Sequence, residues 1–145
     1  TSLSLNRYAV KYSLIATSCS MISILLVNLI KSPIISAFTD IPQTYDLTSK
    51  LLLFSIYLEF GRSLNLIYVS ALKGAGDIKF PVLYGVFSMW GIMVLLSRIL
   101  GVELGFGVVG CWLGIATDET TRGIVMLIRW KSKVWQRKNI VESIK

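Results

Sequence analysis

Four apolar stretches, each about as long as a lipid bilayer is thick, constrain this chain more than any other feature. They cover residues 12–30, 51–72, 80–100 and 104–130. A helix of about 20 residues crosses the roughly 30 Å hydrocarbon core, whereas membrane strands would alternate polar and apolar residues, which these stretches do not. The sequence therefore predicts an all-α membrane protein with four transmembrane helices.

Composition agrees with this prediction and excludes several kinds of chemistry. The chain of 145 residues is 54% hydrophobic and only 16% charged, and it contains no His. Soluble domains carry about 25% charged residues. Without His, neither a Ser-His-Asp nor a Cys-His catalytic arrangement can form, and we expect no enzyme, no cofactor and no resident metal. Cys19 and Cys111 lie in apolar runs, where we expect buried free thiols.

The connectors between the spans contain residues that favour turns and helix starts. Residues 31–50 include two prolines and two aspartates, and residues 73–79 read as a tight turn. Gly74 and Gly76 permit left-handed backbone there, and Asp77 is a good cap for the next helix. The Gly-x-Gly lacks the preceding strand and the full spacing of a phosphate-binding loop, so we interpret it as a turn.

Lys and Arg are distributed unequally between the two sides of the predicted membrane. With alternate loops on the same side, ten basic residues fall on one side and three on the other. Because such an excess marks cytoplasmic loops, we predict a multi-pass protein of the inner or plasma membrane with both ends, including the basic tail 131–145, in the cytoplasm. The net charge of +7 then reflects orientation and attraction to anionic lipid, and gives no reason to expect nucleic-acid binding. The ten are Arg7, Lys11, Lys73, Lys79, Arg129, Lys131, Lys133, Arg137, Lys138 and Lys145; the three are Lys31, Lys50 and Arg98.

Five charged residues lie inside the predicted spans, where each costs about 2.5–3.5 kcal/mol even on the lenient insertion scale. Each acid precedes an Arg by three or four residues, so acid and Arg share a helical face. Asn65 extends the face of the second span, and the acids of the two spans fall at similar depth, so we expect the two clusters to face each other. The five are Glu59 and Arg62 in the second span and Asp118, Glu119 and Arg122 in the fourth.

The charges of this intramembrane set sum to −1, which leaves one carboxylate without a cationic partner. Such a group must take a proton, bind a cation or lie in a water-filled cavity. The ion- or proton-coupling candidates are Glu59, Asp118 and Glu119, with Na⁺ near Glu59 as one alternative, and a supporting polar network is formed by Arg62, Asn65 and Arg122. The alternative is a static lattice of ion pairs that fixes helix register. This alternative suits the two arginines best, and Glu119 fits either interpretation.

Small residues at helical spacing point to close packing. Ser13, Thr17 and Ser20 form a stripe in the first span, and Gly110 and Gly114 have Gly-x-x-x-Gly spacing in the fourth. We expect both sets to pack against neighbouring helices.

Several segments, in order along the chain, resemble the multidrug and toxic compound extrusion (MATE) family of transporters. Residues 71–81, read as A-L-K-G-A-G-D-I-K-F-P, are similar to the family's A-L-R-G/A-A-G-D-T-R-F-P segment. Residues 59–65, E-F-G-R-S-L-N, resemble the E-P-G-R-x-x-N of one bacterial branch, the DNA-damage-inducible-protein-like group, although Phe60 replaces the usual Pro. Residues 118–123 match D-E-x-x-R-G. The resemblance spans nearly the whole chain, and its specificity lies in the order and spacing of the motifs.

This resemblance implies a fold and a function. The chain would be part of a twelve-helix, two-lobe MATE transporter, with residues 1–145 forming helices 9–12, a partial C-terminal lobe. The implied activity is secondary active antiport, which exports cationic or amphipathic compounds such as drugs and toxins in exchange for Na⁺ or H⁺. The implied partners are such a small molecule, membrane lipid and the remaining helices of the transporter. By this resemblance Glu59 is the favoured coupling carboxylate, and Asp118 and Glu119 would be its neighbours across the lobe cavity.

Two other functions stay open at this point. One is a lipid or polysaccharide flippase of the same superfamily, for which a more basic cavity is expected. The other is a non-transporting membrane fragment. The chain begins with Thr1, and alternating access needs two halves that move against each other. We therefore expect a fragment that does not transport alone.

Overall fold

The computed structural model describes residues 2–136, and every regular element in that range is helical. The three long helices are α1 (Ser2–Leu29), α3 (Pro42–Gly74) and α6 (Gly107–Lys131), and the short helix α2 (Lys31–Phe38) joins the first two. The predicted all-α fold is confirmed.

A fourth rod combines α-helical and π-helical turns. It begins with α4 (Lys79–Ser88), continues through the π-helical segment η1 (Met89–Val94) and α5 (Leu95–Arg98), and ends with a second π-helical segment, η2 (Ile99–Glu103). Because π-helical turns contain more residues than α-helical turns, the rod does not keep the regular face of a straight α-helix.

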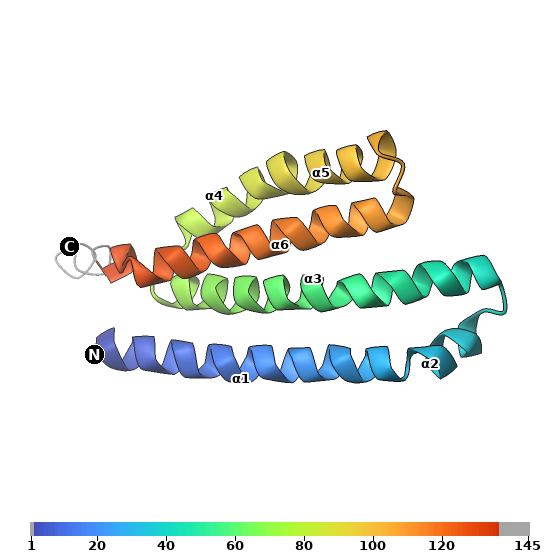
Figure 1. Ribbon diagram of the computed structural model, residues 1–145. Helices are drawn as coiled ribbons and strands as arrows, with labels where there is room; N and C mark the ends of the chain where they lie inside the picture. The colour runs from blue at the N-terminus through green and yellow to red at the C-terminus, as the bar shows by residue number, and fades with distance from the viewer. Residues whose placement is uncertain (1, 137–145) are drawn as a thin grey trace.

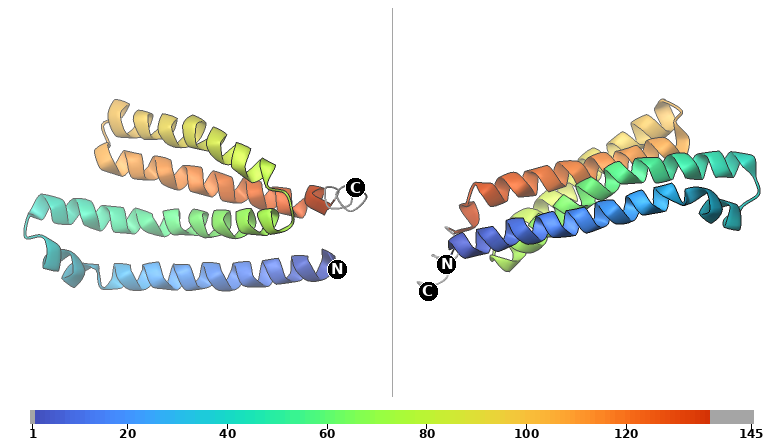
Figure 2. Two further views of the ribbon diagram at one scale, coloured as in Figure 1. Left: turned by 180° about the vertical axis from the view of Figure 1, so that it is seen from behind. Right: turned by 60° about the horizontal axis from the view of Figure 1, so that its bottom comes forward.

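The rods lie side by side in an order that differs from their order in the chain. Figure 1 shows α3 between α1 and α6, with the fourth rod on the other side of α6, and Figure 2 shows the same order from behind. The start of α1 and the end of α6 lie at the same end of the bundle. Helix α3 therefore contacts both the first and the last helix of the described part.

Three of the rods are long and apolar enough to cross a membrane. They are Val10–Leu29 within α1, Pro42–Gly74, which is α3, and Lys79–Glu103, which spans the fourth rod. Helix α6 has 25 residues but does not meet the same condition. The physical reason is the charged group in its middle, Asp118, Glu119 and Arg122.

The helices extend further than the apolar stretches that predicted them. Helix α3 begins at Pro42, which stands in the first turn, where its missing N–H costs nothing. The predicted connector 31–50 thus holds α2 and the first turns of α3. Hydrophobicity locates the segment of a helix that contacts the lipid. It does not detect the polar turns by which the same helix continues outside the lipid.

Few apolar side chains are buried, and most of the buried ones gather at one end. Many large hydrophobic residues have more than half of their surface exposed, among them Leu29, Phe38, Leu83 and Phe87. The buried apolar cluster lies at the end of the bundle that holds the termini, and its members are Tyr68, Leu72, Met126, Trp130 and Trp135. An apolar surface this extensive is suited to lipid and to further helices.

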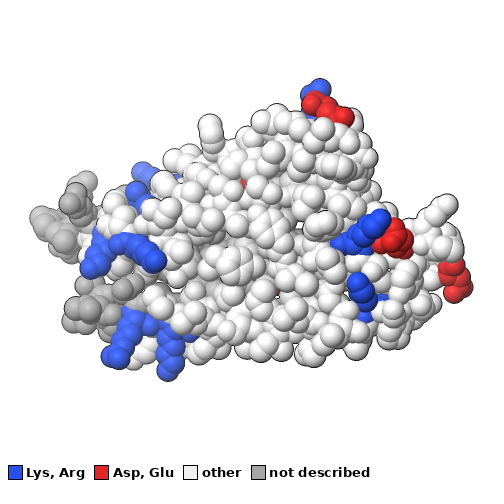
Figure 3. Space-filling model, viewed as in Figure 1, with Lys and Arg blue, Asp and Glu red and all other residues white. Residues whose placement is uncertain are grey.

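Basic residues gather at the end of the bundle that holds both termini. Figure 3 shows blue side chains at that end, and blue beside red at the opposite end. At the opposite end Lys50 pairs with Asp46 at 2.7 Å and Arg98 pairs with Glu103 at 3.5 Å, and all four side chains are largely exposed. The described charges therefore follow the predicted asymmetry. Arg137, Lys138 and Lys145, with most of the predicted basic tail, lie outside the described residues.

The turn between α3 and α4 is tied to the end of α6. Gly76 has φ +86°, which supplies the left-handed backbone that the turn requires. Asp77 was expected to cap the next helix, but the N-cap position is taken by Ile78, and Asp77, fully buried, pairs with Arg129 of α6 at 2.9 Å. The Arg129 guanidinium also lies 4.3 Å from the ring centroid of Phe80. A residue 52 positions away thus holds the turn in place.

Glycines set how closely the rods approach one another. A Cβ at Gly61 of α3 would lie 2.7 Å from the Thr120 Cα of α6, and one at Gly123 would lie 3.0 Å from the Gly61 carbonyl oxygen. On the other side of α6, a Cβ at Gly110 would lie 2.5 Å from the Leu100 carbonyl, and one at Gly114 would meet Ser97. The predicted packing role of Gly110 and Gly114 is confirmed.

The two cysteines are free thiols, as predicted, but the prediction that both are buried is wrong for one of them. Cys111 is half-buried against Ser97, whereas Cys19 is exposed on α1. In a membrane helix an apolar run marks contact with lipid as often as burial inside the protein, which is why the sequence pattern misplaced Cys19.

We predict that Gly61→Ala destabilises the protein by about 1–3 kcal/mol, because the added methyl group would overlap the Thr120 backbone and push α3 from α6. Thermal unfolding of the purified protein in detergent measures this. Gly91→Ala is the matched control, since nothing lies within 4 Å of the added Cβ there. Equal losses in the two variants would contradict the proposed tight contact.

Candidate functional site

The predicted intramembrane residues form two separate polar groups. One lies between α6, α3 and the fourth rod and contains Asp118, Glu119, Arg122 and Asn65. The other lies between α1 and α3 and contains Glu59. Helix α3 contributes to both groups because it stands between α1 and α6.

Asp118 is the centre of the first group. Its carboxylate is 1% exposed, and its two oxygens have different partners. Ser88, at the end of α4, donates its hydroxyl to one oxygen, and Arg122, one turn further along α6, donates to the other. The ion pair therefore neutralises Asp118 within α6, and the Ser88 hydrogen bond ties α6 to the fourth rod.

Glu119 points to the opposite side of α6, toward α3. It accepts a hydrogen bond of 2.7 Å from the Asn65 side-chain amide. Among the described residues it makes no ion pair. The Asn65 oxygen and the Arg122 Nε are buried and have no protein partner. Buried polar atoms of this kind commonly bind water.

Glu59 lies in a different setting, in a groove between α3 and α1. The groove has a volume of about 360 Å³, and Ser20 and Ser23 of α1 line it together with Glu59. Helices α1 and α3 are antiparallel in Figure 1, and the Asn28 amide of α1 donates to the Leu52 carbonyl of α3 at 2.9 Å. This interface therefore combines a carboxylate with hydroxyl and amide groups.

Two further hydroxyls on the helices α1 and α3 are buried without a protein partner. They belong to Thr17 of α1 and Ser63 of α3. Glu59 itself is half-buried and makes no ion pair within residues 2–136. Neither hydroxyl lines the groove of Glu59, although Ser63 lies about one helical turn from Glu59 along α3. Buried unpaired hydroxyls of this kind commonly bind water.

The structure corrects the predicted geometry of Glu59 in two ways. Arg62 shares a helix face with Glu59 by spacing, but it is exposed and the two form no ion pair. Spacing of three residues permits a pair and does not impose one. Glu59 is also not the neighbour of Asp118 and Glu119 across a cavity. Since Gly61 packs on Thr120, the acids are at similar depth, but Glu59 faces α1 on the other side of α3.

Sequence reasoning missed three partners. Ser88 gave a weak signal, as a polar residue in an apolar run, and it is the hydroxyl that binds Asp118. Asp77 and Arg129 gave none as a pair, because only the packed fold brings them together. Within residues 2–136, no group of three or more His, Cys, Asp or Glu side chains forms a metal-binding cluster.

Comparison with known proteins identifies the family. The profile of the family described as MatE matches residues 3–99, about two thirds of the chain. The chain is 41% identical over 115 residues to "Uncharacterized transporter YisQ" of Bacillus subtilis (strain 168), a match that covers 79% of this chain and 25% of the relative. It is 32% identical over 101 residues to "Probable multidrug resistance protein NorM" of Xylella fastidiosa (strain 9a5c), a match that covers 70% of this chain and 21% of the relative.

The chain belongs to the MatE family. It spans about a quarter of the length of the curated relatives it matches. No solved structure matches it. As a MatE chain with three long apolar helices, it is a multi-pass membrane protein.

For this MatE chain we predict that Asp118→Asn lowers the free energy of unfolding by about 3 kcal/mol, because the buried Arg122 charge loses its partner. The double variant Asp118→Asn with Arg122→Gln should recover much of this loss, since it removes both charges. Unfolding of Asp118→Asn, Arg122→Gln, the double variant and the parent in detergent forms a double-mutant cycle that measures the coupling. Additive losses would show that the pair contributes nothing.

Proposed function

We propose that the chain is one part of a longer secondary active antiporter that exports cationic or amphipathic compounds in exchange for Na⁺ or H⁺. The names of the relatives, an uncharacterized transporter and a probable multidrug resistance protein, support this class of function. Its transport partners are the small-molecule substrate and the remaining helices of the protein, because alternating access needs two moving halves.

Glu59 is our candidate for the coupling group, and the observation that carries the proposal is its setting. It is a carboxylate at the depth of the membrane interior, without a cationic partner in residues 2–136, facing a groove with the hydroxyls of Ser20 and Ser23. A carboxyl group in such surroundings either takes up a proton and becomes neutral, or stays ionised and binds a cation that the neighbouring oxygens help to hold. Binding and release of that ion would then alter the packing of α1 on α3.

The other two coupling candidates fit a different role. Asp118 is neutralised by Arg122 within α6 and accepts a hydrogen bond from Ser88 of α4, so it suits a structural role in which it holds the fourth rod on α6. Glu119 has an amide partner and no cation, and we assign it a supporting role together with Asn65. Glu59 lines a groove and has, within residues 2–136, neither an ion-pair partner nor a side-chain hydrogen-bond partner.

The distribution of charges supports an orientation in the membrane. We propose that the end of the bundle with both termini faces the cytoplasm of the inner or plasma membrane. Basic side chains gather at that end, whereas at the opposite end acidic residues pair with Lys50 and Arg98. This asymmetry agrees with the excess of Lys and Arg in cytoplasmic loops.

We predict that Glu59→Gln abolishes ion-coupled efflux, because an amide neither takes up a proton nor carries the charge that holds a cation. The full-length protein that contains this chain is reconstituted in vesicles loaded with a fluorescent cationic compound. Efflux is then driven either by a Na⁺ gradient at equal pH or by a pH gradient without Na⁺. The gradient that stimulates the parent identifies the coupling ion.

The matched control is Glu103→Gln, which makes the same chemical change at an exposed position at the end of the bundle. It should leave coupled efflux intact. Unchanged coupling in Glu59→Gln would refute the role of Glu59. If efflux by the parent depends on neither the Na⁺ gradient nor the pH gradient, antiport itself is refuted, and a flippase or a non-transporting chain is favoured.

A further inference from the structure

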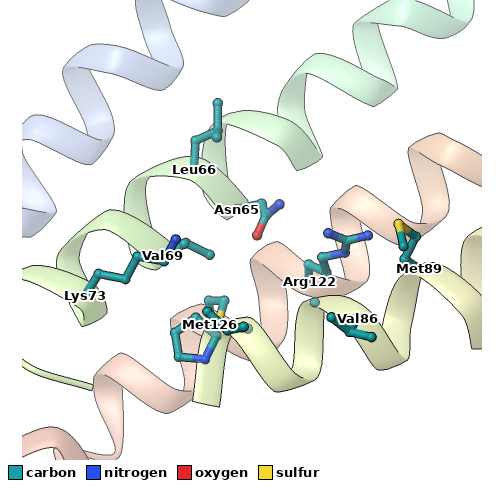
Figure 4. A pocket seen from close by; sticks show the side chains of 11 residues that line it. Asn65, Leu66, Val69, Lys73, Val86, Met89, Arg122 and Met126 are labelled. Carbon is teal, nitrogen blue, oxygen red and sulfur yellow. The ribbon is translucent and has the colours of Figure 1, made fainter. Parts of the chain in front are cut away.

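A second groove lies on the opposite side of α3 from Glu59. It is bounded by α3, α4 and α6 and has a volume of about 290 Å³. Figure 4 shows it between the three helices, with Asn65 and Arg122 at its inner part and Lys73 extending along it past Val69. It shares no lining residue with the groove that contains Glu59.

The charged residues that line this groove are basic, and the charge of one of them, Arg122, is balanced by Asp118 behind it. Lys73 and Arg122 both line it, and no acidic residue does. Lys73 makes no ion pair within residues 2–136. Arg122 uses one terminal nitrogen for Asp118, while its Nη1 lies 3.8 Å from the position that a Cβ of residue 85 would take. Its Nε has no protein partner. The groove thus offers an unpaired ammonium group and unused guanidinium donors.

The walls of the groove are apolar and open to the surroundings of the bundle. Leu66 of α3 and Val82 and Val86 of α4 line it, and each has about half of its surface exposed. An inorganic anion would leave these walls uncovered, whereas a hydrocarbon chain would cover them. Shape and chemistry together suit a molecule with an acidic head and an apolar tail.

The position of Lys73 indicates which end of the groove receives the head. Lys73 is in the last turn of α3, at the end of the bundle where the basic residues gather. Lipid phosphates lie at this level of a membrane, and basic pockets between helices on the cytoplasmic side bind acidic lipid head groups. The tail would then point toward the middle of the bilayer, along α4.

We propose that the groove between α3, α4 and α6 binds an anionic phospholipid, with its phosphate at Lys73 and one acyl chain between α3 and α4. The remaining donors of Arg122 contact the ester oxygens of the same lipid. The lipid covers the unpartnered apolar walls and steadies α4 against α3. This site is separate from the coupling site, and the proposal holds whether or not Glu59 couples transport.

The test counts bound lipid on the full-length protein that contains this chain. The protein is purified from vesicles of phosphatidylcholine with added phosphatidylglycerol, and retained lipid is measured by native mass spectrometry together with the melting temperature. We expect retained phosphatidylglycerol and a higher melting temperature than with phosphatidylcholine alone. Lys73→Gln should weaken the affinity about five-fold, the factor that corresponds to about 1 kcal/mol for one basic residue at an anionic surface.

Two further variants separate the groove from general surface attraction. Gly85→Leu places a side chain in the groove at a position where the nearest atom to an added Cβ is the Arg122 Nη1, 3.8 Å away, and it should displace the lipid while the protein stays folded. Lys79→Gln removes an exposed charge at the same end that does not line the groove, and should change nothing.

Three results would overturn the proposal. Equal losses in Lys79→Gln and Lys73→Gln would show unspecific attraction to the basic end. Full lipid retention in Gly85→Leu would show that lipid binds elsewhere. The same rise in melting temperature with inorganic phosphate alone would show a site for a free anion. An unchanged efflux rate would leave the lipid site standing, because the readout is bound lipid.

Discussion

The close contact between α3 and α6 is the constraint on which the rest of the structure depends. Gly61 and Gly123 bring the two backbones together where other residues would hold them apart. Without a hydrophobic driving force inside a bilayer, such contacts gain their strength from dispersion and from polar groups at short range. The same contact brings the Asn65 amide within hydrogen-bonding distance of Glu119. Because it occupies one side of α3, helix α1 packs on the other side.

A good part of this architecture follows from the sequence. The apolar lengths predict the helices, because crossing a bilayer requires a fixed number of residues, and the unequal Lys and Arg content predicts the charged end. Spacing along one helix also predicted the Asp118–Arg122 pair, since residues four apart are neighbours on any α-helix.

What the sequence could not predict depends on packing between helices. The faces of α3 were unknown, so Glu59 was placed opposite Asp118 when it faces α1. Asp77 looked like a local helix cap, and its actual partner Arg129 is brought to it by the fold. The start of α3 at Pro42 was missed because polar turns outside the lipid carry no hydrophobic signal.

Helix α3 separates two grooves that are lined by charged groups of opposite sign. On the side of α1 an acidic residue faces hydroxyls, and on the side of α4 an ammonium and a guanidinium face hydrocarbon walls. One helix can present both because side chains a few residues apart point to different sides of it. A cation and an acidic lipid can therefore be held a short distance apart without competing for the same groups.

The π-helical segment η1 explains how one rod holds α6 by two serines. Ser88 donates to Asp118, and Ser97 donates to the Cys111 carbonyl and lies against Gly114. The two serines are nine positions apart, which is about two and a half turns of an α-helix and would direct them to opposite sides. The wider turns of η1 take up more residues for each revolution, so the chain completes fewer revolutions and both hydroxyls meet the same helix. Loss of the π-helical geometry would rotate one serine away from α6. A shift of η1 between the π-helical and α-helical forms would therefore strain or break the hydrogen bond from Ser88 to the buried Asp118.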